Sequence, residues 1–250
     1  MSREEQPKDR KSLFLPMFAV VLAFAAAQLL VIAGLGSRLG WWHFRTGFEM
    51  LKYGAYGGIV AALLSVWCQI RAIRTRHTAG IALSAMALIG GLTVAAIPAS
   101  WRMRAKQLPM IHDITTDTAN PPQFTAILPL RKDAPNPADY GGPAVAELQK
   151  KAYPDLATEI LNLPANQAFE RALATARDMG WRIVASDPDQ GRIEASDTTF
   201  WFGFTDDIVI RTTSAGERTL VDVRSVSRVG KSDVGTNAKR IREYLKRLRE

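Results

Sequence analysis

Cysteine and histidine are scarce in this chain of 250 residues, which contains one cysteine and three histidines. The cysteine, Cys68, falls in an apolar stretch, so the polar part of the chain has neither a disulfide framework nor a cysteine nucleophile. His43 and His77 flank apolar stretches, which leaves His112 as the histidine of the polar part. A zinc site usually takes three or four nitrogen, sulfur or oxygen ligands, and no such spacing is present. We therefore expect neither a metal ion nor another cofactor.

A basic excess is missing from the second part of the chain. Residues 1–106 contain 13 lysines and arginines against four acidic residues, whereas residues 107–250 contain 19 against 20. A nucleic-acid-binding domain carries its own basic excess, because it neutralises phosphates. The composition therefore argues against nucleic acid as a partner. The cations of the first part flank apolar segments, as is typical where helix ends meet anionic lipid headgroups.

The first part of the chain contains three long segments without a charged residue. These segments are residues 13–35, 53–70 and 79–101. Each approaches or exceeds the roughly 20 apolar residues that span a bilayer, and the last two are rich in small residues, which allow close helix contact in lipid. We expect a polar tail over residues 1–12 and a three-helix membrane region over residues 13–106. The connector at 36–52 mixes aromatic rings with cations and suits a membrane–water interface.

The distribution of cations indicates which side of the membrane each end of the chain occupies. Lysine and arginine accumulate in the cytoplasmic loops of membrane proteins, and the short loop after the second apolar segment contains Arg71, Arg74 and Arg76. This loop places the N-terminus in the cytoplasm and the C-terminal part in the periplasm, with the helices in a bacterial inner membrane. A cleaved signal peptide is a competing interpretation of the first segment, although signal-peptide cores are shorter, at about 7–15 residues.

The remaining residues, 107–250, have the pattern of a soluble α+β domain. Prolines and glycines interrupt residues 107–164, which we expect to be irregular and to wrap around the domain surface. Residues 165–250 form the expected core. Its expected elements are a helix at 165–179, strands at 181–186, 192–198, 208–213 and 219–229, and a helix at 233–249. This order predicts a two-layer domain in which two main helices pack on a four-stranded antiparallel sheet.

Charged residues alternate with small and apolar ones in the last predicted strand. One face of this strand carries Asp222, Arg224 and Arg228, and the neighbouring strand adds Arg211. Because the helices are expected on the other face, this charged face is expected to be open to solvent. It is interpreted either as a surface that binds an anionic headgroup, glycan or peptide, or as a solvated sheet face whose ion pairs contribute little to stability.

His112, Asp113 and Asp117 form the one place where a histidine and carboxylates gather. They are interpreted either as a metal or acid–base site, or as residues that hold the irregular segment by hydrogen bonds to the backbone. Asp206 and Asp207 are adjacent, so on a strand they would point to opposite faces and could not flank one substrate. We expect these two to form a turn. An enzymatic alternative, an envelope hydrolase or ligand-processing enzyme, would use Asp113, Asp117 and Asp206 with His112.

Several segments of the second part carry a family resemblance. They are residues 111–117, 203–211, 221–228, 229–235 and 237–241. Together they resemble the domain-of-unknown-function family numbered 1499, over about residues 107–250. Proteobacterial members of that family often have membrane helices ahead of the domain. The resemblance implies the fold and an envelope setting, and it supplies no activity.

The sequence therefore predicts a membrane-anchored envelope protein that binds or scaffolds a partner and does not catalyse a reaction. No serine–histidine–acid set or dinucleotide fingerprint is present. The expected partners are the lipid bilayer and an envelope protein, a lipid headgroup or a cell-wall glycan. The candidate binding residues are Arg211, Asp222, Arg224, Arg228, His112 and Asp113.

Overall fold

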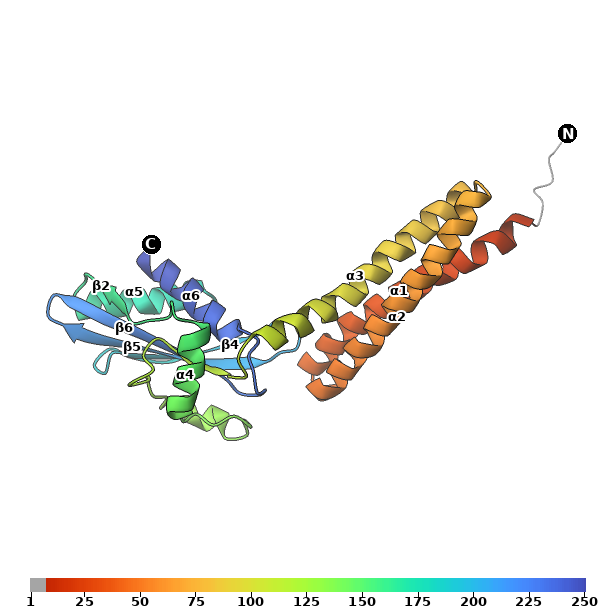
Figure 1. Ribbon diagram of the computed structural model, residues 1–250. Coiled ribbons are helices and arrows are strands. Elements are labelled where there is room, and N and C mark those ends of the chain that lie inside the picture. Colours follow the sequence, from red (N-terminus) through yellow and green to blue (C-terminus); the bar gives the residue numbers. More distant parts are fainter. Residues whose placement is uncertain (1–7) are drawn as a thin grey trace. The chain divides into compact units, whose positions relative to one another are not determined.

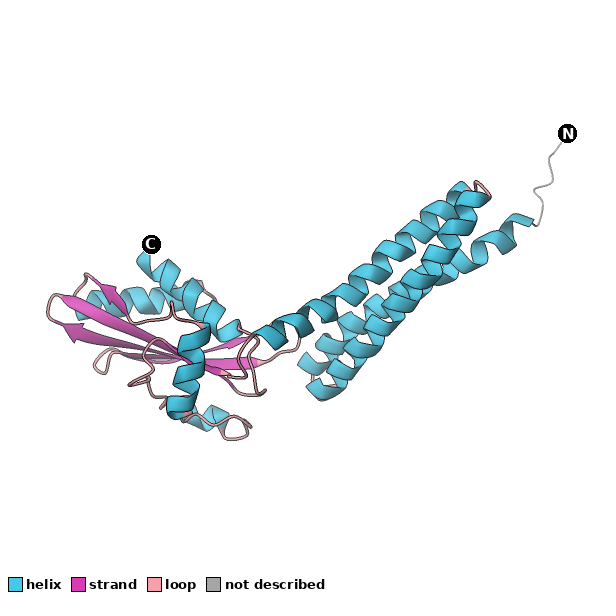
Figure 2. Ribbon diagram, in the orientation of Figure 1, coloured by secondary structure: helices cyan, strands magenta, loops and turns pink. Residues whose placement is uncertain are grey.

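The computed structural model describes the backbone of residues 8–250 and the side chains of residues 13–250. These residues form two units. One contains the residues up to Met103 together with Trp201–Gly203, and the other contains Arg104–Phe200 and Phe204–Glu250. Figure 1 labels the elements of both units, and Figure 2 separates helices from strands by colour.

Three long helices form most of the first unit: α1 (Lys8–Arg38), α2 (Phe44–Arg74) and α3 (Thr78–Gln107), whose last residues belong to the second unit. Each contains a stretch long and apolar enough to cross a membrane, which confirms the prediction of three such helices. The helices are longer than the predicted spans, because hydropathy marks the apolar stretch and not the turns that continue into the interface. The connector predicted at 36–52 is therefore mostly helical, since α2 begins at Phe44. The tail predicted at 1–12 is helical from Lys8, and its residues 1–7 lie outside the described part of the chain.

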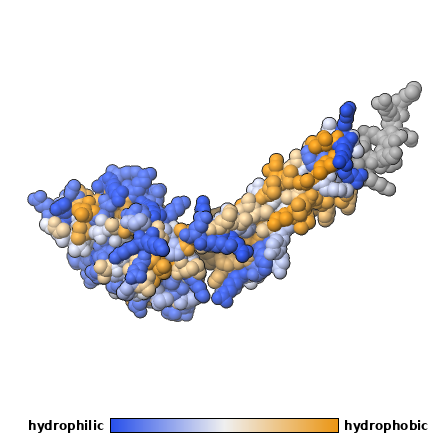
Figure 3. Space-filling model, viewed as in Figure 1, coloured by the Kyte–Doolittle hydropathy of each residue, from blue (hydrophilic) through white to orange (hydrophobic). Residues whose placement is uncertain are grey.

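Small residues bring α2 and α3 into close contact. A side chain at Gly58 would place its Cβ 2.7 Å from the carbonyl oxygen of Gly91, and one at Gly91 would place its Cβ 2.5 Å from the carbonyl oxygen of Gly58. The hydroxyl of Ser84 also donates a hydrogen bond to Oε1 of Gln69, across these two helices. Close approach through small residues stabilises helix pairs in lipid, where water does not drive apolar side chains together. Apolar side chains cover much of the outside of the helices (Figure 3).

The second unit is built on a six-stranded antiparallel sheet. Its strands are β1 (Asp113–Thr115), β2 (Glu159–Leu161), β3 (Arg182–Asp187), β4 (Arg192–Thr198), β5 (Thr205–Ala215) and β6 (Arg218–Ser227). The order is β1-β6-β5-β4-β3, and β2 also pairs with β6. The prediction of four strands is wrong, since the sheet has six. The sequence did not indicate β1 and β2, because they have three residues each and are too short to show an alternating period. The antiparallel arrangement and the α+β class are confirmed.

Helices α5 (Ala165–Asp178) and α6 (Thr236–Arg249) cover one face of the sheet. Their apolar sides pack on the inward-facing residues of β4, β5 and β6 in the main hydrophobic core. The ring of Trp181 stacks on that of Tyr244 with the centroids 5.1 Å apart. The hydroxyl of Tyr244 donates a hydrogen bond to the carbonyl oxygen of Ala172 at 3.0 Å, which joins the two helices. These are the two main helices that the sequence predicts.

The covering segment, residues 116–140, lies over the opposite face of the sheet. It contains the 3-10 helix η1 (Leu128–Arg131), and α4 (Gly142–Ala152) follows it. Two of its apolar side chains pack on two strand valines in a second, smaller core: Phe124, Ile127, Val209 and Val226. The prediction that this face is open to solvent is therefore wrong. The sequence predicts that residues 107–164 wrap around the domain surface, but it could not show which face they cover, because most of the covering segment has no regular period.

Helix α4 protects the outer edge of β1. The buried side chain of Gln149 accepts a hydrogen bond at Oε1 from the backbone N–H of Thr115 at 3.0 Å, and its Nε2 donates to the carbonyl oxygen of Thr115 at 2.6 Å. An antiparallel neighbouring strand would form the same pair of bonds with this residue. The amide of Gln149 therefore satisfies backbone groups that the edge of a sheet otherwise leaves unpaired.

Candidate functional site

Arg224 of β6 lies on the covered face of the sheet and is fully buried. Its guanidinium forms a bidentate ion pair with Asp113 of β1, in which Nε lies 3.0 Å from Oδ1 and Nη2 lies 2.8 Å from Oδ2. The guanidinium also donates hydrogen bonds to the backbone of the covering segment, at the carbonyl oxygens of Pro122 (3.1 Å) and Ala138 (2.6 Å). One arginine thus joins β6, β1 and two parts of the covering segment.

Aromatic rings and burial set the electrostatics around this arginine. The guanidinium carbon of Arg224 lies 5.2 Å from the centre of the Phe124 ring and 5.5 Å from that of Tyr140. Burial raises the pKa of Asp113, and the hydrogen bonds and charge of Arg224 oppose that rise. Burial also raises the pKa of Tyr140 to about 12, so its hydroxyl stays protonated at neutral pH. The charge of Asp113 therefore depends on Arg224.

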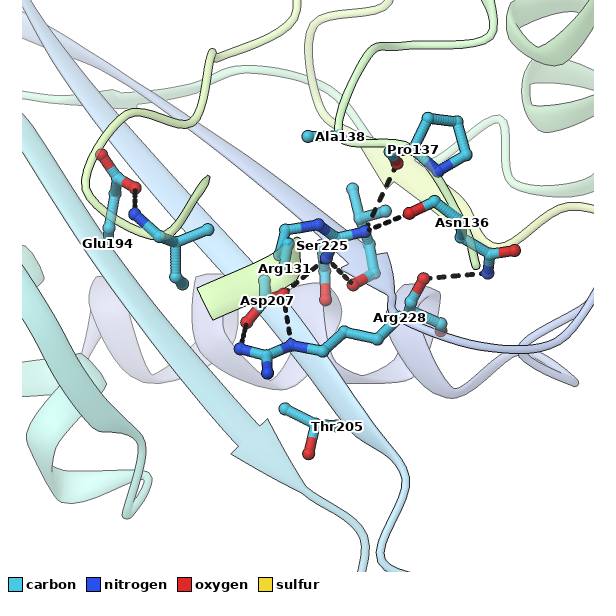
Figure 4. A network of polar contacts seen from close by, with 12 residues as sticks. Arg131, Asn136, Pro137, Ala138, Glu194, Thr205, Asp207, Ser225 and Arg228 are labelled. Atoms are coloured by element: carbon cyan, nitrogen blue, oxygen red, sulfur yellow. Dashed lines mark hydrogen bonds and ion pairs between the residues drawn. The ribbon is translucent and has the colours of Figure 1, made fainter. Parts of the chain in front are cut away.

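Asp207 of β5 forms ion pairs with two arginines on the same face of the sheet (Figure 4). Arg228 binds both of its carboxylate oxygens at 2.8 Å, and Arg131 of η1 binds Oδ2. Arg131 also donates to the carbonyl oxygens of Asn136 (3.1 Å) and Pro137 (3.3 Å). The carboxylate of Asp207 is fully buried, so this cluster fixes η1 and the turn that follows it to the sheet.

Glu194 of β4 holds the beginning of η1. Its fully buried carboxylate accepts hydrogen bonds from the backbone N–H groups of Thr125 (3.0 Å), Ala126 (3.0 Å) and Ile127 (2.9 Å). Arg192 lies 3.1 Å from the same carboxylate and balances its charge. A carboxylate at the amides that begin a helical turn satisfies N–H groups that have no partner within the turn.

Arg211 is one of several arginines of this network that are partly exposed, with 25% of its side chain exposed. It lies 2.9 Å from a carboxylate oxygen of Asp117 and 2.7 Å from one of Asp222. Asp222 is buried and also accepts hydrogen bonds from the hydroxyls of Thr116 (3.1 Å) and Thr158 (2.6 Å). The charges of β5 and β6 are therefore paired with each other and with the chain that covers them.

The structure brings together all the predicted binding residues except His112. Arg211, Asp222, Arg224, Arg228 and Asp113 share the covered face, where they hold one another and the covering segment. The backbone carbonyl of His112 accepts hydrogen bonds from the backbone N–H of Ser227 and the side-chain Nδ2 of Asn237, both at 3.0 Å. These contacts fit the interpretation in which residues near His112 anchor the irregular segment.

Asp206 lies on the helix side of the sheet, away from Asp207. It pairs with Arg240 of α6 at 2.7 Å, and Arg240 also pairs with Asp197 at 2.9 Å. The prediction that these adjacent carboxylates point to opposite faces is confirmed. The prediction that they form a turn is wrong, because β5 begins at Thr205 and both residues pair with β6.

The sequence did not lead to the prediction that Arg131 and Asp207 belong to the charged face. Asp207 could have been found, because it has the same strand parity as Arg211 and therefore shares the charged face. Arg131 gave no comparable signal, because it lies in a short 3-10 helix between prolines and its partner is 76 positions away.

Asp233 at the start of α6 is expected to make stability depend on pH. Its carboxylate accepts hydrogen bonds from the N–H groups of Gly235 (3.1 Å) and Asn237 (2.6 Å), yet burial raises its pKa to about 6. Because this pKa lies above the ordinary value of 3.8, the stabilisation is complete below about pH 3.8 and is lost as the pH rises through 6.

We expect the Asp233→Asn variant to lack this dependence. Between pH 4 and pH 7, the native chain should lose up to about 3 kcal/mol of its free energy of unfolding through Asp233, and the variant should not show this loss. Urea titrations of both proteins across this range measure the difference. Parallel pH profiles for the two proteins would show that Asp233 keeps its ordinary pKa.

Within residues 13–250, the buried charged side chains of this network are paired with side chains of opposite charge. A separate cavity of about 390 Å³ is lined by residues of α5, α6 and the C-terminus: Thr175, Asp178, Glu243, Lys246, Arg247 and Glu250. It contains none of the predicted site residues. Across residues 13–250, no three histidine, cysteine, aspartate or glutamate side chains are placed to hold a metal ion.

Comparison with known proteins identifies the α+β unit. No curated protein matches the chain. A family described as "protein of unknown function (DUF1499)" matches residues 113–248, which include the whole sheet, the covering segment and most of α6. This match extends over more than half of the chain, and the protein therefore belongs to the DUF1499 family.

Proposed function

We propose that this protein is a membrane-anchored envelope protein whose α+β domain binds or scaffolds a partner on the periplasmic side of the bacterial inner membrane. The observation that carries the proposal is the way buried charges fix η1. Ile127 and Arg131 are buried, whereas Leu128 and Leu130 between them are 45% and 46% exposed. A turn held on both sides therefore presents two apolar side chains to solvent.

A rigid apolar turn is suited to binding, because little conformational entropy is lost when it contacts a partner. Glu194 holds the amides at the beginning of η1, and Asp207 holds Arg131 at its end. Pro129 further restricts the backbone between the two leucines. Among the expected partner classes, an envelope protein fits these leucines better than a cell-wall glycan, whose surface is largely polar.

The hydrolase alternative would use Asp113, Asp117 and Asp206 with His112. Each of these carboxylates is paired with a different arginine, and Asp206 lies on the opposite face of the sheet from Asp113. An acid and a base must reach the same substrate. The separation of these groups supports binding over catalysis.

Site-specific photocrosslinking tests the binding proposal. A photoreactive amino acid in place of Leu128 or Leu130 should give a discrete protein adduct in native membranes. The matched control is the same substitution at Ile160 of β2, which is 52% exposed and lies away from η1. Adducts of equal yield from all three positions, or from none, would contradict the proposal.

The periplasmic placement has a separate test. Alkaline phosphatase fused to the C-terminus should be active, because it folds in the periplasm, and a cytoplasmic fluorescent reporter fused there should be dark. Arg71 and Arg74 in the last turn of α2, together with Arg76 in the loop that follows, support this orientation. A fluorescent C-terminal fusion would place the domain in the cytoplasm and leave the test on η1 unaffected.

A further inference from the structure

A cavity of about 110 Å³ lies within the three-helix unit, where α2 leads into α3. One part of its lining is apolar or small and comes from all three helices: Leu15, Pro16, Trp67, Cys68, Ala72 and Gly80. The other part is polar and comes from the end of α2 and the loop after it: Arg71, Thr75 and His77. The cavity is therefore amphipathic, with its polar groups near the end of the predicted span.

Arg71 supplies the positive charge of this cavity. Its guanidinium carbon lies 5.0 Å from the centre of the Trp67 ring. Stacking on an indole leaves the N–H groups at the edge of the guanidinium plane, where they can bind two phosphate oxygens. The sequence contains no aspartate or glutamate between Glu49 and Asp113, so no carboxylate of α2 beyond its first turns or of α3 neutralises this region.

Backbone contacts hold the polar groups beside Arg71. The hydroxyl of Thr75 donates a hydrogen bond to the carbonyl oxygen of Arg71 at 3.0 Å. Nδ1 of His77 accepts a hydrogen bond from the N–H of Gly80 at 3.0 Å, which fixes the imidazole at the beginning of α3. A water molecule needs roughly 10–15 Å³ of such space, so the cavity has room for a phosphate-sized group.

We propose that this cavity binds the headgroup of an anionic phospholipid, with Arg71 on the phosphate and the acyl chains against the apolar surface of α1 and α2. Basic pockets between membrane helices have the charge and depth that such headgroups require. The apolar lining favours a lipid over free phosphate, since a soluble anion gains nothing from Leu15 and Pro16. The proposal concerns the helical unit and does not depend on the function of the α+β domain.

Retention of lipid by the full-length protein tests this inference. The protein is reconstituted in nanodiscs of phosphatidylglycerol and phosphatidylethanolamine in equal amounts, extracted in mild detergent and examined by native mass spectrometry. We expect the native chain to retain phosphatidylglycerol selectively. Arg71→Gln should lower that retention about tenfold, as the loss of one charge-assisted contact predicts.

The matched control is Arg74→Gln, which removes the same charge three positions later from an exposed side chain outside the cavity. It should change retention less than twofold. Equal losses in both variants would show that the end of α2 attracts anionic lipid only through its total charge, and would overturn the proposal. Equal retention of the two lipids by the native chain would also overturn it.

Two further arms address the source of the phosphate and the role of the cavity. Inorganic phosphate added during extraction should not displace the lipid, and displacement would identify a site for free phosphate instead. Cys68→Leu fills part of the cavity without changing the charge and should also lower retention. Circular dichroism checks that each variant keeps its helices, and a folded Cys68→Leu variant with native retention would overturn the assignment of the cavity.

Discussion

Replacement of Arg224 by leucine should lower the free energy of unfolding of the α+β domain by about 3–5 kcal/mol. The substitution leaves Asp113 buried without its counter-charge, and loss of one partner of a buried ion pair has effects of this size. It also leaves the carbonyl oxygens of Pro122 and Ala138 without their donor. Urea unfolding of the full-length protein in detergent, followed by tryptophan fluorescence, measures the change.

Arg242→Leu is the matched control for this experiment. Arg242 forms a bidentate pair with Asp155, but both side chains are largely exposed, at 43% and 53%. Exposed pairs contribute about 0–1 kcal/mol, so this variant should remain close to the native chain. A second substitution, Asp113→Asn, should restore part of the stability lost in Arg224→Leu, because it removes the unpaired buried charge. Equal effects of Arg224→Leu and Arg242→Leu would contradict the role assigned to the buried pair.

Replacement of Glu194 by glutamine should cost about 2–4 kcal/mol and loosen η1. Glutamine keeps one acceptor oxygen where the carboxylate offers two, and its NH₂ group would face backbone donors. At least one of the amides of 125–127 would then lose its partner in a buried position, with a cost of about 1–3 kcal/mol for each unpaired group. Arg192 would lose its charged partner as well.

Hydrogen exchange locates this effect along the chain. The amides of residues 125–127 should exchange faster in Glu194→Gln than in the native chain, while those of α6 change less. Glu159→Gln is a suitable control, because Glu159 lies in β2 and pairs with Arg249, which is 59% exposed. Unchanged exchange at residues 125–127 would show that the covering segment is held by its apolar contacts alone.

The charged face of β6 could be predicted from the sequence, because side chains on a strand alternate between two faces. Asp222, Arg224 and Arg228 lie on the same face, as the alternation predicts, and each pairs with an opposite charge. Parity cannot show what lies over a face. The expectation of an open surface followed from the assumption that only regular elements cover a sheet.

The sequence predicts an irregular segment that wraps around the domain, but not that residues 116–140 cover the charged face, because that position depends on contacts between residues far apart in the chain. Arg224 and Asp113 are separated by 111 positions, and Glu194 meets Ile127 across 67. Frequent prolines remove the periodic signal that would mark a helix or strand. β1 and β2 could not be predicted either, because three residues are too few to establish the alternation that marks a strand.

The amide of Gln149 restricts how a partner can engage this domain. Many recognition domains bind an extended peptide by hydrogen bonds along a free sheet edge. At β1 such a peptide would have to displace Gln149 from both backbone groups of Thr115. This edge is therefore closed to a ligand that would join the sheet as a further strand, and to a second copy of the chain that would pair in the same way.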